Sequence, residues 1–245
     1  MTTSVVSESY ILFQEKMIDL LRQWEERLDS DSITAFTANP IQTEIPFTMQ
    51  VKVECEPGTY QDMLHEILNL VEEWNPELHD QLQRIGAHIT AITLGSTISD
   101  ISSDCQLDPW ILPYVTEQAT RPILRMVSAK YREEITKIET KGLCPCCGEP
   151  VRLALLEKGR KMLLCPRCHA SWQENRLTCS HCGNEDVKAI RYLSVDGEDK
   201  AQIHVCDHCY RYLKVIDIRA MLDKPAPELL DIQTIHLDII AQDNI

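Results

Sequence analysis

The sequence predicts an α+β protein with an all-α N-terminal domain, two tandem metal-ribbon modules and a C-terminal helix. Three observations support this prediction. Apolar residues recur at helical spacing along the first 140 residues, four Cys-x-x-Cys pairs lie within 66 residues, and a further apolar helix pattern follows two prolines near the C-terminus. We expect a helical domain at 1–140, ribbon modules at 141–176 and 177–215, and a strand and helix at 216–245.

The first two helices are predicted from their apolar stripes and end signals. One stripe begins after Ser7 and continues to Leu28 at helical spacing. Residues 31–57 contain three prolines and are expected to form a loop with some extended structure. The second helix is expected to begin at Thr59, whose hydroxyl suits an N-cap, and to end at Asn75, which a proline follows.

Two more helical stripes complete the predicted N-terminal domain. Apolar residues at 4-3-4-3 spacing from Leu78 to Ile92 indicate an amphipathic helix. The last stripe runs from Trp110 to Ile135, and Pro122 within it either kinks one helix or starts another. The tryptophans and methionines of these stripes are interpreted as core residues rather than as a cofactor pocket.

The cysteine pairs are the most specific signal in the chain. Eight thiols in Cys-x-x-Cys pairs are the ligand set for two tetrahedral sites, each made by two pairs around one metal ion. Such sites accept zinc or iron on geometric grounds. The predicted ligands are Cys144, Cys147, Cys165, Cys168, Cys179, Cys182, Cys206 and Cys209.

The stretch that carries these pairs repeats itself. Gly148 and Gly183 follow the second cysteine of the first and third pairs, where a tight turn needs a positive φ. Strand-like residues and a turn follow each time, Lys158-Gly159-Arg160 in the first copy and Asp196-Gly197 in the second. Each copy is therefore predicted to be one hairpin closed by one metal. A cross-braced pairing, in which the first pair joins the third, and disulfides remain open alternatives.

Other residues near the pairs have two interpretations each. Trp172 and Arg176, between the modules, could form a partner-binding surface or could pack within the fold. A histidine beside a pair could replace a cysteine as ligand. These alternative ligands are His169, His181, His204 and His208. Tyr192 and Tyr212 are expected in the core, and Cys55 and Cys105 are expected to be buried thiols. Cys146 is a further thiol without an assigned role.

The charge distribution limits the choice of function. Residues 1–140 hold 10 basic and 23 acidic side chains, a net charge of −13; residues 141–215 hold 12 and 9, a net charge of +3. Nucleic-acid binders carry a basic surface that this balance does not supply, so nucleic acid is not an expected partner. No secretory signal and no apolar run long enough to span a bilayer is apparent, which predicts a cytoplasmic protein with reduced thiols.

The detailed motif resembles a known family. Trp172 follows the second pair at a fixed distance, Arg176 precedes the third pair, Tyr212-Leu213-Lys214 follows the fourth, and His236-Leu237-Asp238 lies in the tail. Together with the cysteine spacing, this pattern resembles the formate dehydrogenase accessory proteins, the FdhE family. The resemblance is close over residues 142–242 and looser over the N-terminal part.

The resemblance implies a fold and a role. It implies a helical domain followed by two rubredoxin-like or zinc-ribbon-like modules, with two tetrahedral metal ions that are each held by four cysteines. It also implies a cytoplasmic maturation factor that contacts the catalytic subunit of formate dehydrogenase and is not itself an enzyme. The sequence contains no Gly-rich phosphate loop, nucleophile elbow or H-E-x-x-H motif.

Two other functions are weighed against this one. The first is a rubredoxin-like iron protein with a redox or electron-transfer role, which an iron site of four cysteines would permit. The second is a nucleic-acid-binding zinc ribbon, which the acidic balance disfavours. The oligomeric state is not predicted by the sequence.

Overall fold

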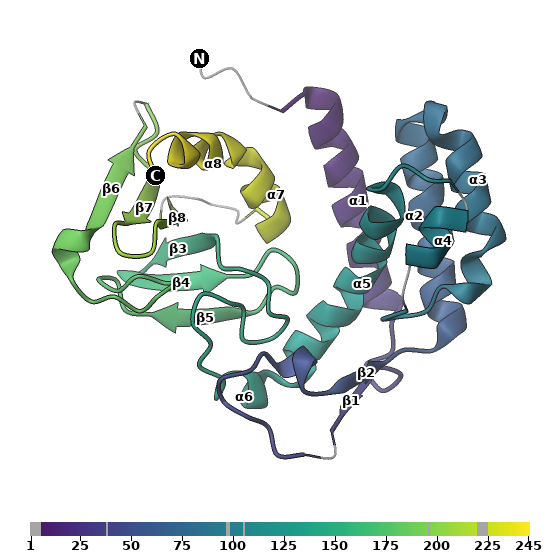
Figure 1. The fold of residues 1–245 in the computed structure, drawn as a ribbon, viewed down its shortest axis with the longest axis horizontal. Helices are drawn as coiled ribbons and strands as arrows, with labels where there is room; N and C mark the ends of the chain where they lie inside the picture. The colour runs from purple at the N-terminus through teal and green to yellow at the C-terminus, as the bar shows by residue number, and fades with distance from the viewer. Residues whose placement is uncertain (1–5, 38, 97–98, 105, 196, 220–224) are drawn as a thin grey trace.

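The computed structural model describes residues 6–37, 39–96, 99–104, 106–195, 197–219 and 225–245. A helical part and a six-stranded sheet lie side by side, and two short helices from the C-terminus cover one face of the sheet (Figure 1). This arrangement confirms the predicted fold class.

The elements follow one another in the order that the stripes and pairs suggest. The helices are α1 (Glu8–Arg27), α2 (Pro57–Trp74), α3 (His79–Ala87), α4 (Ser99–Asp104), α5 (Ile111–Lys130), α6 (Arg132–Ile135), α7 (Pro227–Gln233) and α8 (Ile235–Gln242). The strands are β1 (Thr34–Phe36), β2 (Lys52–Glu54), β3 (Leu153–Glu157), β4 (Arg160–Leu164), β5 (Ser171–Glu174), β6 (Ile190–Ser194), β7 (Ala201–Cys206) and β8 (Arg211–Asp217).

The helical part is built on α1, α2 and α5, whose apolar stripes face one another. Ser7 caps α1, and its hydroxyl accepts a hydrogen bond from the backbone N–H of Tyr10. Pro122 lies inside α5, which continues through it as one helix. The extended structure expected within 31–57 is the antiparallel pair β1–β2.

Several boundaries of the predicted helices are corrected. Glu56 rather than Thr59 caps α2, because its carboxylate accepts from the Thr59 backbone N–H at 2.7 Å and Pro57 already fits the first helical turn. The third stripe forms α3 between two short 3₁₀ turns instead of one long helix. Trp24 is buried as expected, but Trp110 is 46% exposed at the start of α5.

The two predicted ribbons join into one sheet with the strand order β5-β4-β3-β8-β7-β6. Within each half the strands are antiparallel, and the two halves meet through the parallel pairing of β3 with β8, in the register Leu153–Lys214 to Leu156–Asp217. The strand β5, which the sequence patterns did not predict, pairs with β4 at one edge of the sheet. The modules therefore share one hydrogen-bonded layer.

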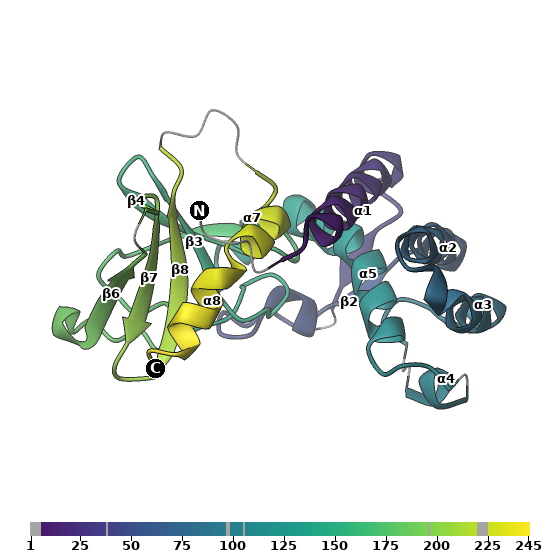
Figure 2. The same ribbon diagram turned by 90° about the horizontal axis from the view of Figure 1, so that it is seen from above.

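The C-terminal segment covers one face of this sheet. Figure 2 shows α7 and α8 lying between β8 and α1. Leu230 and Leu237 pack with Ile203, Val205 and Leu153 in one apolar cluster. The single helix predicted after the two prolines is in fact two, because α7 ends at Gln233 and Thr234 caps it, with its hydroxyl donating to the Leu230 carbonyl at 2.7 Å. In the second ribbon, a 3₁₀ turn at Val187–Ala189 precedes β6.

A buried lysine attaches these helices to the sheet. Lys214 on β8 is fully buried, and its ammonium lies 2.7 Å from Asp231 and 2.8 Å from Asp238. Tyr212 donates to the other oxygen of Asp238 at 2.9 Å.

Within the described residues, none of the helices combines the length and apolarity that crossing a bilayer requires.

We expect Lys214→Ala to lower the free energy of unfolding by about 3 kcal/mol, because it leaves two partly buried carboxylates without their shared cation. Urea denaturation would measure this loss. Lys158→Ala, at an exposed turn, is the matched control and should change stability by less than about 0.5 kcal/mol. Equal stability of the two variants would contradict the ion-paired anchor.

Candidate metal centres

The eight predicted cysteines come together as two separate thiol clusters. Cys144, Cys147, Cys165 and Cys168 form the first, and Cys179, Cys182, Cys206 and Cys209 form the second. The four sulfur atoms of each cluster lie within 4.8 Å of one another. The pairing is thus local, first pair with second and third with fourth, and the cysteines of both clusters are free thiols rather than disulfides.

The spacing of the sulfurs fits a tetrahedral ion. The Sγ–Sγ distances are 3.5 Å for Cys144–Cys168 and 3.6 Å for Cys147–Cys165. In the second cluster they are 3.7 Å for Cys179–Cys209 and 3.9 Å for Cys182–Cys206. In a regular tetrahedron with metal–sulfur bonds of about 2.3 Å, neighbouring sulfurs are roughly 3.8 Å apart. Each cluster could therefore hold one metal ion with little rearrangement.

The ionisation of the thiols also calls for a cation. Neighbouring thiols of the first cluster, together with burial, raise the pKa of Cys168. Burial opposes ionisation of Cys206, but the backbone N–H groups of Cys209 and His208 outweigh it and lower the pKa of that thiol. Four closely packed thiols cannot all lose their protons without a positive ion among them, so the donor set fits a bound divalent metal.

All four pairs use a left-handed residue directly after the second cysteine. Gly148 and Gly183 both have φ near +74°, which confirms the prediction made for them. His169 and Tyr210 occupy the equivalent positions of the other two pairs, with φ of +57° and +55°. The sequence did not predict a left-handed backbone at His169 and Tyr210, because histidine and tyrosine do not indicate that conformation as glycine does. The repeat nevertheless aligns these two positions with the two glycines.

The first cluster lies in the core that the helices and the sheet share. Its cysteines are all buried and belong to the same apolar cluster as the α1, α2 and α5 stripes. The 3₁₀ turn Phe47–Met49 is seated on the first pair, because the N–H groups of Phe47 and Thr48 donate to the carbonyls of Pro145 and Cys146 at 2.8 and 2.9 Å. A Cβ at Gly148 would collide with Met49, so the two segments pack backbone against side chain.

Ion pairs attach the second Cys-x-x-Cys pair to the helices. Arg167 binds Glu117 of α5 through two parallel contacts of 2.8 Å. The His169 ring lies 2.7 Å from the carboxylate of Glu228 on α7. Glu228 in turn binds the buried Arg125 of α5 at 2.7 Å. Burial alone would raise the pKa of Glu228, but His169 and Arg125 lower it to about 2, so the Glu228 carboxylate is charged at neutral pH.

The second cluster is farther from the helices and more open to solvent. Cys182 and Cys209 are only partly buried. Its position is fixed mainly by the sheet and by Lys161 of β4, a fully buried side chain that pairs with Glu174 at 2.7 Å and donates to the Thr178 carbonyl at 3.0 Å. The two clusters thus differ in protection, which their similar sequences did not predict.

Both clusters consist of cysteine alone, and three of the four histidines beside the pairs contact other residues. His169 binds Glu228, and the His181 ring lies 2.7 Å from the Tyr212 carbonyl. His204 contacts the Tyr192 ring edge to face, and burial, with the charges of Lys161 and Arg176 nearby, lowers its pKa to about 4. His208 is exposed.

The remaining predicted residues are distributed differently from expectation. Trp172 is half-buried on β5 against the apolar core, and Arg176 is exposed just after that strand. A partner-binding surface of these two residues stays a prediction. Tyr192 was expected in the core but is 45% exposed, because its strand β6 is an edge of the sheet. Cys55 is half-buried; Cys105 lies outside the described residues. Cys146 is fully buried and lies beside the Cys168 thiol without joining the cluster.

Comparison with known proteins finds several relatives of one kind. The chain is 26% identical over 187 residues to an FdhE homolog of Aquifex aeolicus, covering 73% of this chain and 64% of that protein. It is 29% identical to the Stutzerimonas stutzeri FdhE homolog, over 45% of this chain and 37% of the relative. With the Pseudomonas aeruginosa FdhE homolog it shares 33% identity, over 44% and 38%. No family model matches the sequence.

A solved structure shares the fold. The crystal structure of the FdhE protein from Pseudomonas aeruginosa matches 94% of this chain and 82% of its own, with a TM-score of 0.62 and 17% identity. The chain spans less than two thirds of the length of each of the three relatives matched by sequence. By sequence the chain is similar to these FdhE homologs, and it shares the fold of the solved FdhE protein.

We expect the metal of the second cluster to leave first, because Cys182 and Cys209 are partly exposed while the first cluster is enclosed in the core. Challenging the metal-loaded protein with EDTA should give two phases of release, the slower on the order of tenfold slower. A chromogenic chelator that competes for the released metal would record both phases. Cys182→Ser should remove the fast phase, and a single phase for the unaltered protein would contradict the difference in protection.

We expect Tyr210→Gly to stabilise the metal-loaded protein by roughly 0.5–1 kcal/mol, since it relieves a left-handed backbone at a residue whose side chain is 65% exposed. Tyr210→Ala, which keeps the unfavourable φ, is the control and should not stabilise. His169→Gly should destabilise despite the same φ relief, because it removes the contact with Glu228. Chemical denaturation distinguishes the three.

Proposed function

We propose that this chain is a cytoplasmic accessory protein for the maturation of formate dehydrogenase, that each cysteine cluster holds one metal ion, and that the protein contacts the catalytic subunit of that enzyme. What supports the proposal most directly is the combination of sequence similarity to several FdhE homologs with two sulfur clusters of tetrahedral spacing. The eight clustered cysteines are the proposed ligands.

The geometry of the clusters supports a binding role rather than catalysis by the metal. Four thiolates complete the tetrahedral shell of a zinc or iron ion and leave no position for a substrate or a water. The free energy of metal binding then stabilises the folded state, and structural zinc contributes on the order of 10 kcal/mol in small zinc fingers. In the first cluster this energy would stabilise the junction of helices and sheet, because the Cys144 and Cys165 pairs lie within their common core.

A redox role for iron is the second candidate, and the second cluster is where it applies. Cys182 and Cys209 are partly exposed, so an ion bound there would lie within reach of an electron donor at the surface. Metal analysis of anaerobically purified protein, with visible spectra before and after dithionite, separates the two candidates. Two zinc ions and no colour would support purely structural sites, whereas iron that bleaches reversibly would support the redox role.

We expect Cys165→Ser and Cys206→Ser, one in each cluster, to lose bound metal and the ability to restore formate dehydrogenase activity in a strain lacking this protein. Each change removes one of four ligands from a closed site. Cys55→Ser, at a free thiol outside both clusters, is the matched control and should keep both properties. A variant with all eight clustered cysteines changed to serine that still folds and restores activity would refute the proposal.

Contact with the catalytic subunit has its own test. An affinity column that carries the purified protein should retain the immature catalytic subunit. The metal-loaded protein should retain more of this subunit than protein stripped of metal by a chelator. Equal recovery with a column that carries no protein would contradict the proposed partner.

A further inference from the structure

A cleft of about 870 Å³ opens on the sheet face opposite α7 and α8. Residues of both ribbon modules line it, from β4 and β5 on one side and from β6 and β7 on the other. His204 lines the cleft while its neighbours Ile203 and Val205 pack in the cluster under α8, and this alternation along β7 places the cleft on the opposite face. Both edge strands of the sheet, β5 and β6, contribute to it.

The floor of the cleft is electrically balanced. Lys161 is fully buried and pairs with Glu174 at 2.7 Å, and Ser180 donates to the same carboxylate. Glu174 is the only carboxylate among the described residues that line the cleft. The floor therefore presents no free charge to a ligand.

The walls carry the uncompensated charge. Arg160 and Arg176 line the cleft, are exposed, and form no ion pair with any carboxylate in the described ranges of the chain. Glu157, opposite Arg160 in the hairpin, does not line the cleft. Two guanidinium groups without a carboxylate partner among the described residues thus line one cleft of a protein whose net charge is −14. Guanidinium groups bind carboxylates in bidentate fashion, so the walls complement an acidic ligand.

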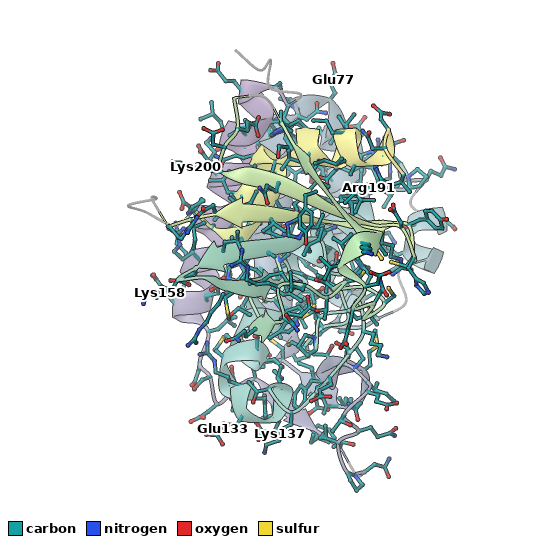
Figure 3. The ribbon with its side chains drawn as sticks, turned by 90° about the vertical axis from the view of Figure 1, so that its left-hand side faces the viewer. Glu77, Glu133, Lys137, Lys158, Arg191 and Lys200 are labelled. Carbon is teal, nitrogen blue, oxygen red and sulfur yellow. The ribbon has the colours of Figure 1, made fainter. Side chains whose placement is uncertain are left out.

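Lysines continue this positive character beyond the cleft. Lys158 precedes Gly159, which lines the cleft, and Lys200 lies two residues before Gln202, which also lines it. Figure 3 shows that these two lysines, in two hairpin turns of the sheet, lie at the same edge of the molecule. A long acidic segment leaving the cleft at this edge would meet them.

The cleft also offers apolar surface and strand edges. Leu177 and Tyr192 line it and are 51% and 45% exposed. Among the described residues β5 and β6 are the edge strands of the sheet, the position at which an extended chain could add a further strand. Charge on the walls, apolar side chains between them and open strand edges together match a peptide segment better than a small anion.

We propose that this cleft binds an extended acidic segment of a partner protein, with carboxylates on Arg160 and Arg176 and an apolar side chain against Leu177 and Tyr192. The proposal rests on the proposed function only for the identity of the partner, because the cleft geometry alone defines the chemistry of the segment. A nucleic acid fits less well, since the acidic remainder of the molecule repels a long polyanion.

The test is fluorescence anisotropy with a labelled eleven-residue peptide of alternating glutamate and leucine and a lysine–leucine peptide of the same length. The metal-loaded full-length protein should bind the acidic peptide, and Arg160→Glu with Arg176→Glu should weaken binding at least about tenfold. Arg132→Glu with Lys137→Glu is the matched control: it makes the same charge change at exposed residues of the helical part, and Lys137 lies far from the labelled turns in Figure 3. The control variant should bind as the unaltered protein does.

Reversal of the charges gives the sharper result. The Arg160→Glu, Arg176→Glu variant should gain affinity for the lysine peptide, which a merely misfolded variant would not do. Equal weakening in the control variant, equal binding of both peptides by the unaltered protein, or tighter binding of inorganic pyrophosphate than of the acidic peptide would overturn the proposal. The last result would identify a small-anion site instead.

The outcome is separable from the proposed function. Peptide binding that is insensitive to the cleft charges refutes the cleft proposal, whatever the effect of the protein on formate dehydrogenase. Peptide binding that follows the charges, in a protein whose deletion leaves formate dehydrogenase activity unchanged, supports the cleft and refutes the proposed function.

Discussion

The convergence of four cysteine side chains on one point at the first cluster is the constraint on which the structure most depends. It ties the Cys144 and Cys165 pairs together, and around them gather a turn from residues 47–49, the α5 ion pair of Arg167 and the α7 bridge of Glu228. The first cluster thereby lies in the core of the helices, while the sheet has further apolar clusters of its own, one of them under α7 and α8. The second cluster has the same local geometry but orders only the outer half of the sheet.

Buried cations perform the joining that apolar packing alone does not achieve. Arg125 lies between the helices and the C-terminal segment. Lys161 lies between the two ribbons. Lys214 lies between the sheet and the helices α7 and α8. Each is paired with carboxylates, as a charge in a low-dielectric interior requires. An apolar residue could fill the same volume, but a charged pair also fixes which carboxylate must lie opposite, and so fixes the relative position of the elements.

The sequence predicted the features whose causes are local. The cysteine spacing predicted both clusters and their local pairing, and apolar periodicity predicted the helices that pack the core. It did not predict that β8 would pair in parallel with β3, because that contact joins residues about sixty apart and has no periodic signal. The same holds for Tyr192, whose aromatic character suggests burial while its exposure follows from its place on an edge strand, and for Glu56, which caps α2 although glutamate is an uncommon cap.

The parallel pairing of β3 with β8 sets the order in which this chain can fold. β3 ends at Glu157 and β8 begins at Arg211, so the first hairpin leaves the ribosome with one edge unsatisfied until the entire second ribbon has been made. Contacts so distant in sequence form slowly, and an open strand edge is a template for association with other chains. Early closure of the first cluster would hold that hairpin in shape during the interval, which makes the supply of metal a matter of timing during synthesis as well as of final stability.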